Sequence, residues 1–135
     1  MHRIVCLAAV LGLIGCHLPP EPIPVQPVPE NGKVLEYSEV LNRARVQAGA
    51  ANEAFYLDKW KELEDAAGAL EQTAGYLAKA TLVPDKHKDK LKANADELTK
   101  LTSKLREAAK TQNVKLANET LQRIHLKVRE LRPDA

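Results

Sequence analysis

The sequence predicts an all-α domain in the form of an up-down-up-down four-helix bundle. Ala, Leu, Lys and Glu dominate the 135 residues and aromatic residues make up only 4%, a composition that favours helices over sheets. From Val34 to Leu131, apolar residues recur in steps of three and four, which places them on one face of a helix. Residues typical of turns separate these periodic segments. One domain fits this length.

Four helices of about twenty residues, each about 30 Å long, are expected at 34–56, 59–81, 86–110 and 113–131. Each carries one apolar stripe that must be buried against the other helices. The first two stripes are Tyr37, Leu41, Ala44, Ala48, Ala51, Phe55 and Trp60, Leu63, Ala67, Leu70, Ala74, Leu77. The last two are Leu91, Ala95, Leu98, Thr102, Leu105, Ala109 and Val114, Ala117, Leu121, Ile124, Val128, Leu131.

The breaks between the helices are predicted from local signals. Val83-Pro84-Asp85 ends the second helix, and Asp85 is the expected N-cap of the third. Thr111-Gln112-Asn113 separates the third from the fourth. The first stripe changes phase only between Phe55 and Trp60, so we place the first turn near Leu57-Asp58, with Asp58 capping the second helix.

The apolar pattern repeats with an offset of 54 residues. Adding 54 to the first stripe gives the third, and adding 54 to the second gives the fourth. Residue identity at this offset is slight. We therefore predict one helical hairpin repeated in pattern.

Before the helices, residues 1–15 are expected to be a cleaved export signal. A short positive region, Met1-His2-Arg3, precedes an apolar run from Ile4 to Ile14 that is too short to span a bilayer as a helix. The end of this run and the two residues after it, Leu13-Ile14-Gly15-Cys16, resemble the lipobox of bacterial lipoproteins. That resemblance implies cleavage between Gly15 and Cys16 and attachment of lipid to the Cys16 thiol.

Residues 16–33 are expected to form a lipidated linker to the folded domain, residues 34–135. Six of the eight prolines fall between Pro19 and Pro29, a run that excludes helix and favours polyproline II over roughly 35 Å. A mature bacterial lipoprotein carries three acyl chains, which give stable anchoring. His17 stands where retention in the inner membrane usually requires Asp, so the periplasmic side of the outer membrane is the expected location.

The charge and the cysteine content limit the partners and the kinds of site that are expected for the mature domain. The formal charge is +2, or +1 once Arg3 leaves with the signal, so nothing indicates a nucleic-acid partner. Both cysteines, Cys6 and Cys16, lie in the first sixteen residues. The mature domain is therefore expected to have no disulfide, no thiolate metal site and no cysteine nucleophile.

Two histidines remain in the domain. His87 lies in the charged run Asp85-Lys86-His87-Lys88-Asp89 and is expected to be solvated. His125 follows Ile124 of the buried stripe, so it flanks the core and could reach the interior, or be a satisfied histidine at the bundle edge.

Residues 108–117 and 124–129 resemble the last two helices of the cytochrome b562 and cytochrome c′ class of four-helix bundles. The resemblance implies His125 as an axial haem ligand and Arg129 as the partner of a haem propionate. The chain departs from that class, since it has no Cys-x-x-Cys-His and its only methionine is Met1. With these departures, the resemblance implies a five-coordinate haem that is not covalently attached to the protein.

No enzyme motif is found. No Glu stands three residues before either histidine, as a carboxylate-bridged metal centre requires, and no catalytic triad or Gly-rich phosphate loop is present. We therefore expect no metal, no enzymatic activity, and a binding or scaffold role with the membrane and envelope proteins as partners. The alternatives are a haem or electron-transfer module using His125, and a bundle that opens to bind a small apolar ligand or a peptide. The oligomeric state is left open.

Overall fold

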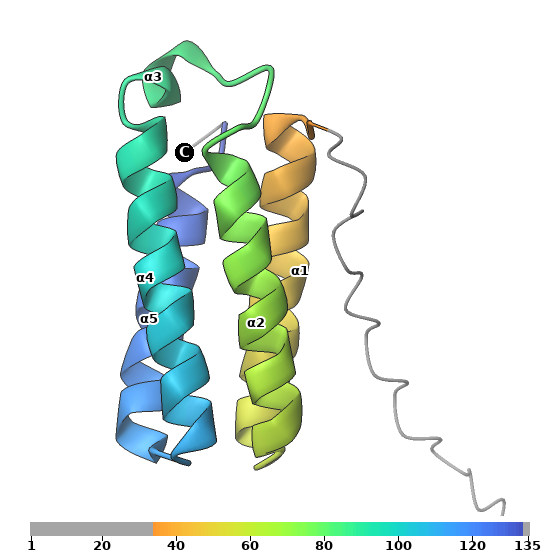
Figure 1. Ribbon diagram of the computed structural model, residues 1–135, viewed down its shortest axis with the longest axis vertical. Coiled ribbons are helices and arrows are strands. Elements are labelled where there is room, and N and C mark those ends of the chain that lie inside the picture. Colours follow the sequence, from red (N-terminus) through yellow and green to blue (C-terminus); the bar gives the residue numbers. More distant parts are fainter. Residues whose placement is uncertain (1–33, 134–135) are drawn as a thin grey trace, which may run out of the picture.

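The computed structural model describes residues 34–133, and this part of the chain is all-helical. Four long helices lie side by side (Figure 1): α1 (Tyr37–Tyr56), α2 (Trp60–Leu77), α4 (Leu91–Lys110) and α5 (Val114–Glu130). A short helix, α3 (Asp85–Lys88), lies above one end of them. The described residues contain no strand, so the predicted all-α class is confirmed. The predicted signal, 1–15, and linker, 16–33, lie outside the described residues.

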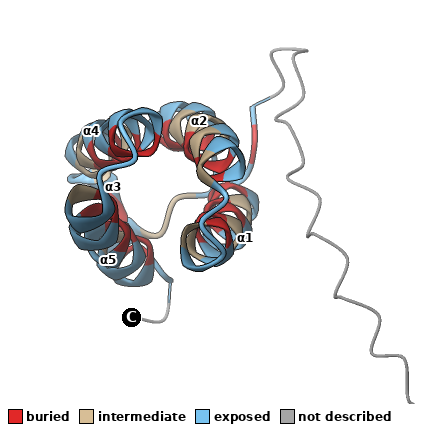
Figure 2. Cartoon of the chain, turned by 90° about the horizontal axis from the view of Figure 1, so that it is seen from below, coloured by how far each residue is buried: buried red, intermediate tan, exposed pale blue. Residues whose placement is uncertain are grey.

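The long helices surround a common apolar core. Seen end-on, their buried faces point inward (Figure 2), and packing runs from α1 to α2, from α2 to α4, from α4 to α5 and from α5 back to α1. Alanine makes up a larger share of the buried apolar residues in the first hairpin than in the second. The buried alanines of α1 are Ala44, Ala48, Ala51 and Ala54, whereas α4 and α5 bury Leu98, Leu101, Leu105, Leu121 and Ile124.

Three predicted helix boundaries are wrong, and tertiary contacts explain why. The chain around Leu35 pairs with Thr81: Tyr37 N donates to Thr81 O at 2.8 Å, and Thr81 N donates to Leu35 O at 3.0 Å. The first helix therefore begins at Tyr37 instead of 34, and the second ends at Leu77 instead of 81. The predicted helix 86–110 is divided at Asp89–Lys90, where α3 turns over the end of the helices and α4 starts in a new direction.

The predicted N-caps Asp58 and Asp85 are also wrong. Lys59 and Pro84 occupy the N-cap positions of α2 and α3, and neither helix has a side-chain cap. Asp58 instead adopts a left-handed backbone with φ of 54°, which closes the turn. The break at residues 111–113 is confirmed, and there Asn113 does cap α5, its Oδ1 accepting from Leu116 N at 3.0 Å.

The two hairpins share one turn geometry, 54 residues apart. Asp58 and Gln112 both have positive φ, 54° and 50°. The backbone bond from Lys59 N to Ala54 O, 2.9 Å, has its counterpart from Asn113 N to Ala108 O, also 2.9 Å. The pattern repeat seen in the sequence is therefore also a repeat of backbone structure over the described hairpins.

Tyr37 and His87 close the end of the domain opposite the two tight turns. The Tyr37 hydroxyl donates to Leu131 O at 2.6 Å, and His87 Nε2 lies 3.1 Å from Arg132 O. Their rings stack with centroids 5.6 Å apart. Both contacts satisfy carbonyl groups just after the end of α5, which the helix itself leaves unpaired. The prediction that His87 is solvated is wrong, because α3 carries its ring inward until only 8% remains exposed.

The first hairpin buries polar atoms that have no hydrogen-bond partner among the described residues. They are both amide atoms of Gln47 on α1 and the hydroxyl of Thr73 on α2. The second hairpin has Leu101 at the position corresponding to Gln47 and Lys127 at the position corresponding to Thr73. Lys127 Nζ is paired with Glu97 Oε2 at 2.7 Å, so the second hairpin satisfies both positions.

Replacing Gln47 with the residue of the second hairpin should stabilise the domain. Gln47→Leu keeps the side-chain size and removes an unpaired buried amide, so we expect the free energy of unfolding to rise by about 1–2 kcal/mol. Chemical denaturation measures this. Exposed Gln72→Leu on α2 is the control and should change stability by less than about 0.5 kcal/mol. Destabilisation by Gln47→Leu would contradict the expectation.

Tyr37 should make the domain sensitive to alkaline pH. Burial raises the pKa of Tyr37 to about 12, above its usual value of 10.0. Because the folded state binds this proton more tightly than the unfolded state, the stabilisation is present below pH 10 and is lost as pH rises from 10 to 12. Absorbance of tyrosinate should show a component near pH 12 that Tyr37→Phe removes. A titration unchanged by that substitution would refute this assignment.

Candidate functional site

The structure places the predicted site residues in two groups. Gly15 and Cys16 lie outside the described residues. His125 and Arg129 lie on α5, one helical turn apart, and both are exposed. Ile124 beside them is fully buried. The expectation that His125 could reach the interior is not met, because a rotation of about 100° per residue turns it away from the core when Ile124 points into it.

This placement does not fit a haem held inside the domain. An iron bound to His125 would lie at the surface of α5, while the interior beside it is filled by Leu121, Ile124 and Val128. Within residues 34–133, no group of three or more His, Cys, Asp or Glu side chains could hold a metal ion. The haem assignment therefore stays a prediction from resemblance, without support from the geometry.

A groove between α1 and α5 is one concave feature of the described surface. Its volume is about 270 Å³. Leu41 and Val128 are buried and form an apolar floor. Around this floor lie the polar side chains of Ser38, Asn42, Arg45 and Arg132, with Pro133 at the end.

The groove is part of a longer basic strip. His125 and Arg129 are four residues apart on one side of α5, and Arg132 follows two residues after this helix ends. Lys127, by contrast, faces α4, where it is paired with Glu97. We call this strip the α1–α5 seam. It comprises Ser38, Asn42, Arg45 and Gly49 on α1, Asn118, Gln122, His125 and Arg129 on α5, and Arg132 just after α5.

The α1–α5 seam contains three arginines and a histidine but no acidic residue. Arg45 Nη2 donates to Asn42 Oδ1 at 3.1 Å, which orients the guanidinium without neutralising it. Within the described part of the chain, no ion pair is formed by Arg45, Arg129 or Arg132. The positive charge of this strip is therefore not balanced locally by residues 34–133.

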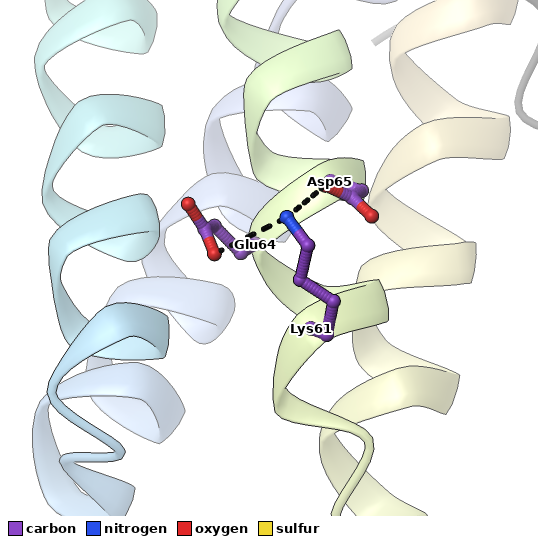
Figure 3. A network of polar contacts seen from close by, with 3 residues as sticks. All are labelled: Lys61, Glu64 and Asp65. Carbon is purple, nitrogen blue, oxygen red and sulfur yellow. Dashed lines mark hydrogen bonds and ion pairs between the residues drawn. The ribbon is translucent and has the colours of Figure 1, made fainter.

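Some other cations on the surface are paired with acids of their own helix. On α2, the Lys61 ammonium lies between two carboxylates (Figure 3), 2.9 Å from Asp65 Oδ1 and 3.5 Å from Glu64 Oε2. The hydrogen bond to Asp65, together with the charge of both carboxylates, raises the pKa of Lys61. Exposed pairs of this kind contribute little stability, and with two carboxylates around one ammonium this cluster has no excess positive charge.

Comparisons with known proteins give no relative from which a function could be transferred: no family model, no curated protein and no solved structure matches the chain. None of the helices formed by residues 34–133 is long and apolar enough to cross a membrane. The candidate site therefore depends on the geometry and charge of this chain.

The groove was not identified from the sequence, although part of its signal was present. Arg45 and Arg132 are 87 residues apart, and neither belongs to a local motif. The usable signal was the spacing of His125 and Arg129 along one side of a predicted helix, with Arg132 directly after it. The sequence alone did not predict which side of α1 faces this strip, because that depends on how the helices pack.

The exposed position of His125 predicts the result of a haem titration. When haem is added to the protein, we expect no Soret shift that depends on His125, because the ring offers no enclosed apolar site for the macrocycle. Absorbance of the wild type and of His125→Ala measures this. A saturable shift abolished by the substitution would instead support the cytochrome-like alternative.

Proposed function

We propose that this chain is a bacterial lipoprotein whose helical domain is a non-enzymatic binding or scaffold module of the cell envelope. Cys16 carries the lipid, and the Pro-rich segment holds the domain away from the membrane on the periplasmic side, with the outer membrane favoured. The lipobox residues Leu13-Ile14-Gly15-Cys16 support the anchor.

Within this proposal, the domain is an up-down-up-down four-helix bundle. Two observations support that topology. The turns after α1 and after α4 are tight, which makes each pair of helices antiparallel. The connection from α2 to α4 stays at one end of the domain, where α3 lies (Figure 1). Such a bundle presents long grooves between neighbouring helices, which suits a binding role.

The single observation that carries the binding role is the unbalanced positive charge of the α1–α5 seam beside an apolar groove. Uncompensated guanidinium groups at a recessed apolar surface favour recognition of an acidic ligand. The two alternatives, haem binding at His125 and uptake of a small apolar ligand or peptide in the core, stay predictions. No contact among the described residues favours either of them.

The anchor is tested by two cysteine substitutions. In a bacterial host, the wild-type product should begin at Cys16 and carry fatty acids, as measured by mass spectrometry, and should fractionate with membranes. Cys16→Ala should abolish lipid attachment, because the thiol that accepts the lipid is gone. Cys6→Ala is the matched control and should leave processing unchanged, since Cys6 leaves with the signal. A wild-type product without fatty acid would contradict the proposed anchor.

A further inference from the structure

We infer that the α1–α5 seam is a docking site for an acidic, partly apolar segment of another protein. The inference rests on the proposed binding function and specifies the chemistry of the partner. Its first support is charge: Arg45, Arg129 and Arg132 lie along the seam, and none of them is paired with an acid among the described residues.

The second support comes from comparing the two repeated hairpins. By the offset of 54, the seam between α2 and α4 is the counterpart of the α1–α5 seam. That counterpart is closed by its own ion pair, Arg106 Nη1 to Glu71 Oε2 at 3.0 Å. The positions corresponding to Arg106 and Glu71 are Asn52 and His125, which do not form such a pair. The α2–α4 seam thus has an ion pair of its own, whereas the α1–α5 seam has an amide and an imidazole at the corresponding positions.

The two seams also differ in how closely their helices pack. The helices α2 and α4 pack over most of their length, whereas α1 and α5 pack less extensively and leave the groove above Leu41 and Val128. Within the α2–α4 seam, Gly68 lies beside the Arg106 side chain, whose Cδ would be 4.0 Å from an added Cβ. The groove is therefore a specific feature of the α1–α5 side.

The shape of the groove favours a protein segment over a membrane surface. Its apolar floor is recessed between two helices, so a flat layer of lipid headgroups would reach the arginines but would not cover Leu41 and Val128. An extended chain or a helix can insert apolar side chains there while its carboxylates pair with Arg45 and Arg132. Ser38 and Asn42 add hydroxyl and amide groups that can hydrogen-bond to a peptide backbone.

The test uses the full mature protein in nanodiscs of neutral lipid, with fluorescein-labelled peptides in which Glu alternates with Leu. We expect saturable binding by fluorescence anisotropy that weakens with added salt, and no binding of matched peptides with Lys in place of Glu. Arg45→Glu combined with Arg132→Glu should weaken binding by at least about tenfold. Arg45→Gln with Arg132→Gln, which removes charge without reversing it, provides a milder second variant if the first does not fold.

The matched control is Lys100→Glu with Lys104→Glu, which makes the same change in net charge at exposed positions of α4. It should change the affinity by less than about twofold if the seam is the site. Equal weakening in both double variants, or no saturable binding of the Glu peptide, would overturn the inference. A third outcome would also overturn it: the protein associates with phosphatidylglycerol nanodiscs, loses that association when Arg45 and Arg132 are replaced, and does not bind the peptide. Because mass spectrometry reads the lipid on Cys16 separately, failure of the anchor and failure of the seam are distinguishable.

Discussion

The burial of one narrow apolar stripe on each of four helices is the constraint on which the rest of this structure depends. Residues spaced by three and four face the core, and residues between them remain in solvent. On α1, four alanines are buried alongside Tyr37, Val40 and Leu41. The large buried side chains of α2, α4 and α5 are mainly leucines. The resulting core is too closely filled beside Ile124 to hold a large ligand without rearrangement.

The two ends of the domain are closed by different means. At one end, two tight turns form from local backbone bonds and left-handed residues, and they need no help from distant segments. At the other end, the chain must join segments that are far apart in sequence. Tyr37 bonds to Leu131, 94 residues away, and His87 contacts Arg132, 45 residues away. This end therefore depends on side chains whose roles are visible only after the helices have packed.

That division explains how much could be predicted from the sequence. The helical class, the break at residues 111–113 and the offset of 54 all follow from local periodicity, and the structure agrees with them. The end of α2 and the division between α3 and α4 could not be predicted, because the pairing of Leu35 with Thr81 and the burial of His87 decide them. Asp is a residue type that often caps helices, but Asp58 lies in the turn itself, with positive φ. A propensity rule cannot choose between those two roles.

The candidate site was harder to predict than the fold for a related reason. A groove belongs to two helices, and the sequence shows only which residues share a side of each one. The sequence singles out His125 as a histidine beside a buried stripe, but in the structure it lies on an exposed side next to Arg129 and Arg132.

The two repeated hairpins allow the α1–α5 seam to be compared with its counterpart between α2 and α4. Two hairpins with the same turns and the same stripes would be expected to close both of their seams alike. Of these two seams, only the one between α2 and α4 has an ion pair across it among residues 34–133. Folding alone does not require the other seam to gather three arginines without an acid, since like charges on one surface repel one another. The acidic partner that we propose for the α1–α5 seam would account for that asymmetry.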